Sequence, residues 1–158
     1  RDQYNCNFIS AMPTNLYGYN DNYHPKNSHV VPSLIRKFCS AIKNNLSSVE
    51  IWGSGSPLRE FLFVDDLAEA CVFLMHNYNK KEIVDIGFGS DVSIKDLANL
   101  ICKKTNYKGK IIFNQSMPDG TLKKLMDSSK INSLGWKPKI SLDIGLELAI
   151  NDYKNNYE

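Results

Sequence analysis

His29 is the side chain whose type and position best suit acid–base chemistry. It stands in NSHVVP, residues 27–32, where a loop rich in Asn, Tyr and Pro passes into an amphipathic run. An imidazole has an ordinary pKa of about 6.5, so it exchanges a proton near neutral pH. On the residues alone, His29 is either a working acid or a polar side chain at the start of a helix. The other two histidines, His24 and His76, are assigned no role.

Arg59 and Trp52 flank a glycine turn, GSGSPL at residues 53–58. The guanidinium of Arg59 can bind a diphosphate through two parallel hydrogen bonds, or it is a solvated side chain at the start of a strand. Trp52 ends the preceding strand and either packs on a ligand or fills core. Asp119 lies in PDG, a sequence typical of a type I turn.

The composition excludes several classes of protein. The 158 residues are 42% hydrophobic and 23% charged, with a net charge of +2, which is ordinary for one globular domain of α/β or α+β type. Both charge signs are interspersed, so a nucleic-acid partner has no support. No apolar stretch approaches the roughly 18 to 20 residues that span a bilayer, and no charged-then-apolar leader opens the chain. These features predict a cytoplasmic protein without a membrane partner.

The four cysteines, Cys6, Cys39, Cys71 and Cys102, form no C-x-x-C pair and have no histidine at metal-ligand spacing. We therefore expect no metal site. The last three of these cysteines lie in apolar periodic runs, which favours buried core positions.

The elements that must position these residues alternate between strands and helices. A helix is expected from a cap at Asn27 or Ser28 to about Asn44, and another from a cap at Asp65 or Asp66 to about Asn77. Residues 13–28 read as a long binding loop. Further strands are expected over 7–12, 49–52, 60–64, 82–88 and 110–114, and further helices over 93–105, 129–134 and from Ser141 to the C-terminus.

This alternation predicts a doubly wound α/β fold, yet the glycine fingerprint that binds a dinucleotide, G-x-G-x-x-G after a first strand, is absent. The nearest candidate, GSGS at residues 53–56, lacks the third glycine and the Lys-Ser/Thr of a phosphate loop. The sequence also opens at Arg1 like the middle of a domain. We interpret it as part of a larger chain.

Three segments carry a resemblance to a known family: MPTNLYGYNDNYHPKNSHVVPSLIRKF, IWGSGSPLREFLFVDDLAEA and MPDGTLKKLMDSSKINSLGWKPKISLDIGL. They resemble the C-terminal half of the GDP-L-fucose synthase family, a branch of the extended short-chain dehydrogenase/reductases. The resemblance implies an α/β fold, the substrate-binding part of a Rossmann-like enzyme without its dinucleotide-binding half. Residues 1–158 would then form a single substrate-binding domain, with strands of the Rossmann sheet at 7–16 and 82–88.

The implied parent enzyme is a homodimeric, NADPH-dependent epimerase and reductase that converts GDP-4-keto-6-deoxy-D-mannose to GDP-L-fucose. Its cofactor would be NADP(H) and its partner a GDP-sugar. Its Tyr-x-x-x-Lys pair and a catalytic cysteine would lie in the absent half. Alternatives remain a related epimerase or reductase of another GDP-sugar, including a heptose, and, for this chain alone, a binding module that performs no chemistry.

The resemblance also implies roles for individual residues. His29 becomes the catalytic acid and also lines the cofactor. The segment PTNL supplies four further cofactor-lining residues, and four residues contact the substrate: Pro13, Thr14, Asn15 and Leu16 for the cofactor, and Lys37, Trp52, Arg59 and Asp119 for the substrate. Lys37 departs from the arginine usual in the family and loses its planar fork, a contact that Arg36 could supply instead. Tyr19 and Phe63 replace a common proline and histidine.

Overall fold

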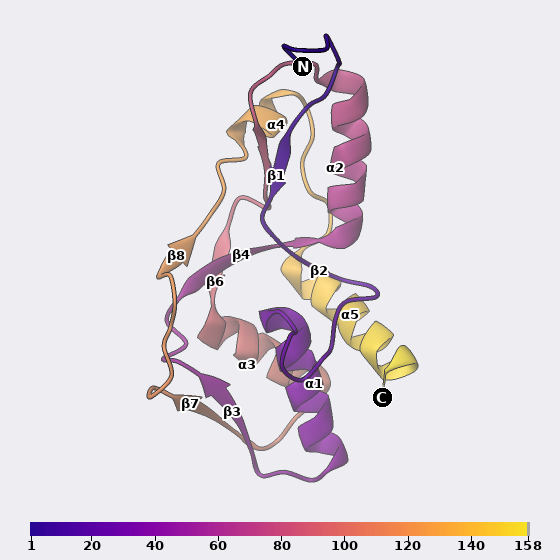
Figure 1. The fold of residues 1–158 in the computed structure, drawn as a ribbon. Coiled ribbons are helices and arrows are strands. Elements are labelled where there is room, and N and C mark those ends of the chain that lie inside the picture. The colour runs from indigo at the N-terminus through magenta and orange to yellow at the C-terminus, as the bar shows by residue number, and fades with distance from the viewer. Residues whose placement is uncertain (158) are drawn as a thin grey trace.

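Strands and helices alternate along residues 1–157, the part of the chain that the computed structural model describes (Figure 1). Glu158 lies outside the described residues. The helices are α1 (Val30–Lys43), α2 (Val64–Asn77), α3 (Ile94–Thr105), α4 (Ser129–Ser133) and α5 (Leu142–Asn156). The strands are β1 (Ala11–Pro13), β2 (Asn15–Tyr17), β3 (Ser48–Trp52), β4 (Leu58–Phe63), β5 (Val84–Ile86), β6 (Asp91–Ser93), β7 (Lys110–Asn114) and β8 (Lys123–Lys124). The predicted α/β class is confirmed.

Strand β4 is the junction of the molecule. Its first residues pair with β6 on one edge and with β8 on the other, while Phe61–Phe63 pairs with β2. Because β2 and β6 lie on opposite edges of β4, β2 and β8 follow each other along the same edge. Two parallel pairs, β1 with β5 and β3 with β7, stand apart from this sheet.

Two hydrophobic cores lie on either side of β4. Successive side chains of a strand point to opposite faces, and accordingly Phe61 and Phe63 enter one core while Leu62 enters the other. Helices α1, α3 and α5 supply most of the first core, and α2, α4 and strand β5 supply most of the second. Figure 1 shows these as the lower and upper parts of an elongated molecule.

Serine caps begin two helices as the sequence predicts. The Ser93 hydroxyl accepts a hydrogen bond from the Asp96 amide at 3.0 Å and donates one to the Asp96 carboxylate at 2.6 Å. Ser141 caps α5 through the amide of Ile144 at 3.4 Å. These local signals succeed because a cap involves residues only three positions apart.

Two other predicted caps are wrong. His29, rather than Asn27 or Ser28, occupies the N-cap of α1, and its side chain makes no capping bond. Phe63 occupies the N-cap of α2. Asp66 is 2% exposed and accepts hydrogen bonds from the amides of Lys139 and Ile140 at 3.1 and 2.9 Å. The carboxylate that the local pattern assigned to the helix cap therefore binds a segment that is distant in sequence.

The predicted strand over 7–12 begins only at Ala11, and the predicted loop over 13–28 contains strand β2. Pro13 has no amide hydrogen, but the next residue, Thr14, donates to Ile86 O at 2.9 Å, and the chain then passes to β4. Strands β6 and β8 are not among the elements predicted from the sequence. All three missed strands are two or three residues long and are held by partners remote in sequence, which no local period reveals.

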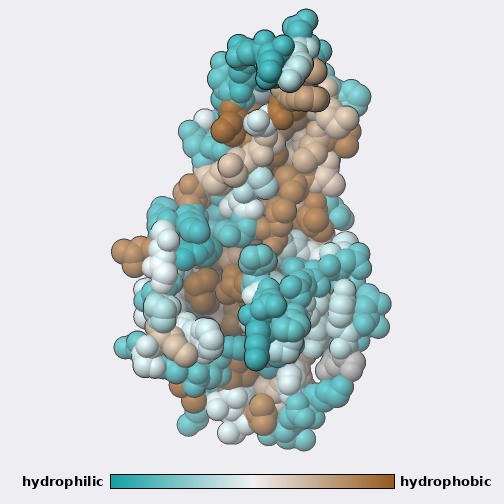
Figure 2. Space-filling model, viewed as in Figure 1, coloured by the Kyte–Doolittle hydropathy of each residue, from teal (hydrophilic) through white to brown (hydrophobic). Residues whose placement is uncertain are grey.

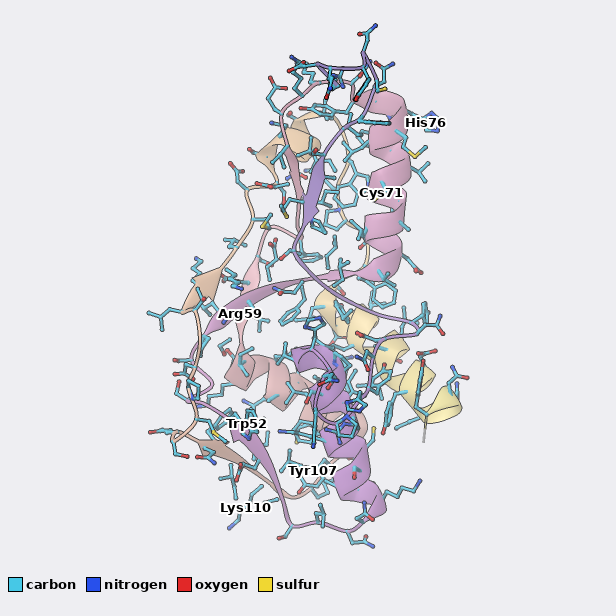
Figure 3. All side chains as sticks on the ribbon, viewed as in Figure 1. Trp52, Arg59, Cys71, His76, Tyr107 and Lys110 are labelled. Atoms are coloured by element: carbon cyan, nitrogen blue, oxygen red, sulfur yellow. The ribbon has the colours of Figure 1, made fainter. Side chains whose placement is uncertain are left out.

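The expected burial of the cysteines is only partly correct. Cys39 is buried and Cys102 is half-buried, but Cys71 is exposed on α2 (Figure 3). Ala70 and Leu74 already fill the core-facing side of this helix, and Cys71 lies about 100° around the helix from Ala70. None of the four cysteines forms a disulfide bond within residues 1–157.

Within residues 1–157, no three His, Cys, Asp or Glu side chains are grouped so that they could hold a metal ion. None of the helices described is long and apolar enough to cross a bilayer.

Replacing Asp66 with Asn tests its role in joining α2 to the C-terminal segment. The amide would leave one of the two backbone N–H groups facing a donor, so we expect a loss of about 1 to 3 kcal/mol in unfolding free energy. Asp65→Asn, on the same helical turn but exposed, is the matched control and should change stability by less than about 0.5 kcal/mol. Urea denaturation measures both, and equal effects would contradict this role.

Candidate functional site

Lys37 and Trp52 form one end of a row of predicted substrate residues. The Lys37 ammonium lies 6.0 Å from the centroid of the Trp52 ring and donates a hydrogen bond to Glu50 O at 2.9 Å. Burial, reinforced by the charge of Arg36 and opposed by that of Glu50, lowers the pKa of Lys37. Trp52 remains 63% exposed, so one face of its ring contacts a cation while much of its surface is open to a ligand.

Asp119 connects Trp52 to the rest of the row through the glycine turn. Its carboxylate accepts hydrogen bonds from the Ser54 amide at 2.6 Å and from the Ser54 hydroxyl at 2.7 Å. Gly53 has φ +83°, and a Cβ there would overlap the Asp119 carboxylate. The bonds from Ser54 lower the pKa of Asp119.

Arg59 lies at the other end of the row. One guanidinium nitrogen donates to Leu58 O at 2.7 Å. The other terminal nitrogen of the guanidinium lies near Gly120, the residue after Asp119. A Cβ built on Gly120 would be 3.8 Å from this nitrogen. Arg59 is also in register with Lys124 of the parallel strand β8. All four predicted substrate residues therefore belong to one row, Lys37–Trp52–Asp119–Arg59, and Figure 3 shows Trp52 and Arg59 on the same side of the molecule.

The predicted cofactor segment 13–16 runs beside β4. Asn15 is in register with Phe61, and its amide nitrogen donates to Glu60 O at 2.8 Å. The Thr14 hydroxyl donates to the same carbonyl at 3.3 Å. The Pro13 and Asn15 side chains are exposed, and Leu16 packs against the second core. The segment thus presents polar groups at its surface on a well-anchored backbone.

His29 lies at the start of the helix that carries Lys37. Its side chain is exposed, and the eight-residue separation corresponds to about 12 Å along the helix. Burial raises the pKa of Asp21, whereas the amide of Asn22, the nearby His29 and the amide of Gly18 oppose that rise.

The loop that delivers His29 is anchored on α5. The buried Tyr23 donates to Ala149 O at 3.3 Å and packs its ring 4.6 Å from that of Tyr153. The amide of Asn20 donates to Asp152 at 3.1 Å. Arg36, the alternative to Lys37 as a ligand group, instead reaches back to Pro25 O at 3.5 Å. The C-terminal helix therefore sets the position of the histidine.

Sequence reasoning assigned no role to four residues of this region: Asp21, Ser54, Glu60 and Lys124. A charged residue inside an apolar run, as Glu60 is within LREFLF, was the available signal for a buried polar contact. The Asp119–Ser54 bond and the Arg59–Lys124 register span many residues and have no local signature. Cys71 and His76 lie on α2, far from the row (Figure 3). A cavity of about 550 Å³ between residues 7–9 and the end of α2 contains none of the predicted site residues.

The row combines two cations, Lys37 and Arg59, with one exposed indole and a carboxylate. Lys124 adds a third cation beside Arg59. Arg59 and Lys124 can balance the charge of a phosphate group, since a guanidinium binds phosphate oxygens through paired N–H groups. The Trp52 ring offers a stacking surface. The arrangement suits an anionic ligand that also carries a ring.

Comparison with known proteins identifies the family of this chain. Residues 1–87 match the model of the NAD dependent epimerase/dehydratase family. The chain belongs to the NAD dependent epimerase/dehydratase family. Among members of this family, the chain is 53% identical over 156 residues to GDP-L-fucose synthase 1 of Arabidopsis thaliana, covering 99% of this chain and 48% of the relative. It is 44% identical over 165 residues to GDP-L-fucose synthase of Escherichia coli strain K12, covering 99% of this chain and 51% of the relative.

A solved structure gives the same result for this epimerase/dehydratase chain. The GDP-L-fucose synthetase from Naegleria fowleri bound to NADP superposes with a TM-score of 0.91 at 29% identity, covering 99% of this chain and 49% of that one. The chain spans about half the length of the curated relatives it matches. The predicted family and Rossmann-like fold class are thereby confirmed.

The Asp119–Ser54 contact predicts a pH-dependent stability. Because the pKa of Asp119 is lowered in the folded chain, its contribution is present above the ordinary pKa of about 3.9 and is lost as pH falls through the folded value. Asp119→Asn should therefore lower Tm at neutral pH, with the difference shrinking in acid. Thermal unfolding measured by circular dichroism across this range checks it, with Asp65→Asn as control. A difference independent of pH would contradict the bond.

Proposed function

We propose that this chain is the substrate-binding part of an NADPH-dependent GDP-L-fucose synthase, which epimerises and reduces GDP-4-keto-6-deoxy-D-mannose. The observation that carries the proposal is the row from Lys37 to Arg59, which joins four residues assigned by sequence to the substrate. The names of the curated relatives support a fucose synthase over an enzyme of another GDP-sugar.

Within the row, the diphosphate binds Arg59, with Lys124 as a second positive charge on the neighbouring strand. A planar guanidinium binds two phosphate oxygens at once, whereas an ammonium acts as a point charge. Trp52 provides the apolar surface for a ring of the ligand. Asp119, already bonded to Ser54, keeps unused lone pairs with which its carboxylate accepts hydroxyl or N–H groups of the substrate.

His29 acts as the acid in the epimerisations. Inversion beside a ketone removes a proton on one face of the sugar and returns one on the other, so it needs a base and an acid at separate positions. His29 is exposed at the start of α1, on the same helix as the substrate residue Lys37. It delivers the proton, while the base belongs to another part of the full-length enzyme.

Residues Pro13, Thr14, Asn15 and Leu16, together with His29, border the NADP(H) site. The residues present fit such a border, because the Asn15 amide nitrogen is held by Glu60 O and its carbonyl oxygen is left to accept a hydrogen bond. When bound, NADPH supplies the hydride that reduces the C4 ketone. The solved relative bound to NADP supports this assignment.

Residues 1–158 form one substrate-binding domain in this proposal, and β1 and β5 extend a Rossmann sheet that the dinucleotide-binding half completes. Figure 2 shows apolar residues gathered over the β1 and α2 end of the visible face. Exposed apolar side chains of this end include Phe8, Met12, Val72 and Met75. The full enzyme is a homodimer in the cytosol, a compartment that suits cysteines without disulfide bonds.

Calorimetric titration of this 158-residue chain with GDP, and with UDP as a second ligand, tests the binding row. GDP should bind more tightly than UDP. Arg59→Ala should weaken the binding free energy of GDP by about 1.5 to 3 kcal/mol, the usual contribution of a charged hydrogen bond. Lys154→Ala, an exposed cation on α5, should leave the affinity unchanged. Equal affinities for GDP in the wild type and Arg59→Ala would contradict the assignment of the diphosphate.

His29→Asn in the full-length enzyme tests the acid. Loss of the proton donor should lower kcat for GDP-L-fucose formation by about 10²- to 10⁴-fold. GDP affinity should remain within about twofold, because no phosphate contact is removed. His24→Asn, a substitution in the adjoining loop, is the matched control. Product analysis by chromatography measures the outcome, and full epimerisation by His29→Asn would remove His29 from the mechanism.

A further inference from the structure

Glu60 is a charged residue in the middle of an otherwise apolar strand segment. It is completely buried, at 0% exposure, and follows Arg59 directly in β4. Because successive side chains of a strand point to opposite faces, Arg59 and Glu60 project in opposite directions. Burying a carboxyl group is costly unless its oxygens are hydrogen-bonded, so its bonds show what it is used for.

The two side-chain oxygens of Glu60 bind two separate segments. One accepts a hydrogen bond from the Gly89 amide at 2.7 Å, and the other accepts one from the Met126 amide at 3.0 Å. Gly87 packs so closely against the carboxyl group that a Cβ there would overlap it. Met126 is two residues beyond Lys124, the strand partner of Arg59. The carboxyl group thus fixes the segment that places a second cation beside Arg59.

The main-chain carbonyl of Glu60 binds a third segment. It accepts hydrogen bonds from the side-chain amide nitrogen of Asn15 at 2.8 Å and from the Thr14 hydroxyl at 3.3 Å. Strands β8 and β2 follow each other along one edge of β4, with Glu60 between the residues that pair with each. Its bonds therefore join the row that faces the substrate to the segment that borders the cofactor.

We propose that Glu60 is a positioning residue that fixes Arg59 and Lys124 relative to segment 13–16, and so aligns the substrate with the cofactor. The proposal rests on the proposed function. An apolar residue would fill the same space without the cost of a buried carboxyl group. It would not hold the amides of Gly89 and Met126, so the segment that carries Lys124 would no longer be tied to the residue whose main-chain carbonyl holds segment 13–16.

Glu60→Gln in the full-length enzyme keeps the size of the side chain but turns one acceptor into a donor that faces a backbone N–H. We expect about a tenfold rise in the Kd of GDP, whereas the KM of NADPH should stay within about twofold, because the main-chain carbonyl that holds segment 13–16 is kept. Arg59→Ala should change only the first and Asn15→Ala only the second. Glu69→Gln, an exposed glutamate paired with Lys139 on α2, is the matched control and should change neither.

A double-mutant cycle separates positioning from general loss of structure. If Glu60 acts on GDP through Arg59, the effect of Glu60→Gln on the Kd of GDP should fall to less than about twofold in the Arg59→Ala background. An undiminished effect in that background, or no effect of Glu60→Gln on either ligand, would overturn the proposal.

Gly87→Ala provides a second variant should Glu60→Gln fail to fold, because its Cβ displaces the same carboxyl group from the opposite side. It should reproduce the loss of GDP affinity with little change in the KM of NADPH, and an unchanged GDP affinity in a folded Gly87→Ala enzyme would equally overturn the proposal. Activity of the wild-type enzyme on the GDP-sugar is measured in parallel. A wild type that forms no GDP-L-fucose would count against the proposed function, whereas a competent wild type with unaffected variants would count against Glu60 alone.

Discussion

The pairing of β4 with three other strands is the constraint on which the rest of the structure depends. Six residues, Leu58–Phe63, receive β6 on one edge and both β8 and β2 on the other. The alternating direction of their side chains sends Phe61 and Phe63 into one core and Leu62 into the other. A slip of one residue in the pairing of β4 would exchange these faces. It would also exchange the directions in which the Arg59 and Glu60 side chains point. The register that separates the two cores is therefore the register that builds the site.

The division into two cores gives the site its two sides. Helices α1, α3 and α5 surround the first core. His29 is the N-cap of α1, and Lys37 lies eight residues further along the same helix. The second core holds Val84 and Ile86 of β5, and Leu16, at the end of the proposed cofactor segment, packs against it. Since β4 lies between the cores, residues from both sides approach each other along this strand. That geometry explains why a short stretch of sequence contributes to both proposed binding regions.

The sequence predicts what is determined locally. The caps at Ser93 and Ser141, the periodic helices and the longer strands follow from residues a few positions apart, and the structure confirms them. Strands β2, β6 and β8 are two or three residues long and form only because distant strands meet them. Asp66 looks like a helix cap until residues 139 and 140 are folded against it. For the site, residue types and the family resemblance indicate which side chains to examine, but the contacts of Asp119 with Ser54 and of Glu60 with Gly89 require the tertiary fold.

Lys37 shows how one substitution redistributes roles within the row. Its ammonium is held by Glu50 O and lies over the Trp52 ring, and burial lowers its pKa. A compact ammonium fixed in this way stabilises the orientation of the indole, but it cannot grip two phosphate oxygens as a planar guanidinium does. Arg36 does not replace that grip, because its guanidinium is turned toward Pro25 O. In the proposed function, bidentate recognition of a diphosphate is therefore assigned to Arg59, whose direction is set by β4 and whose neighbouring charge, Lys124, is set by the strand beside it.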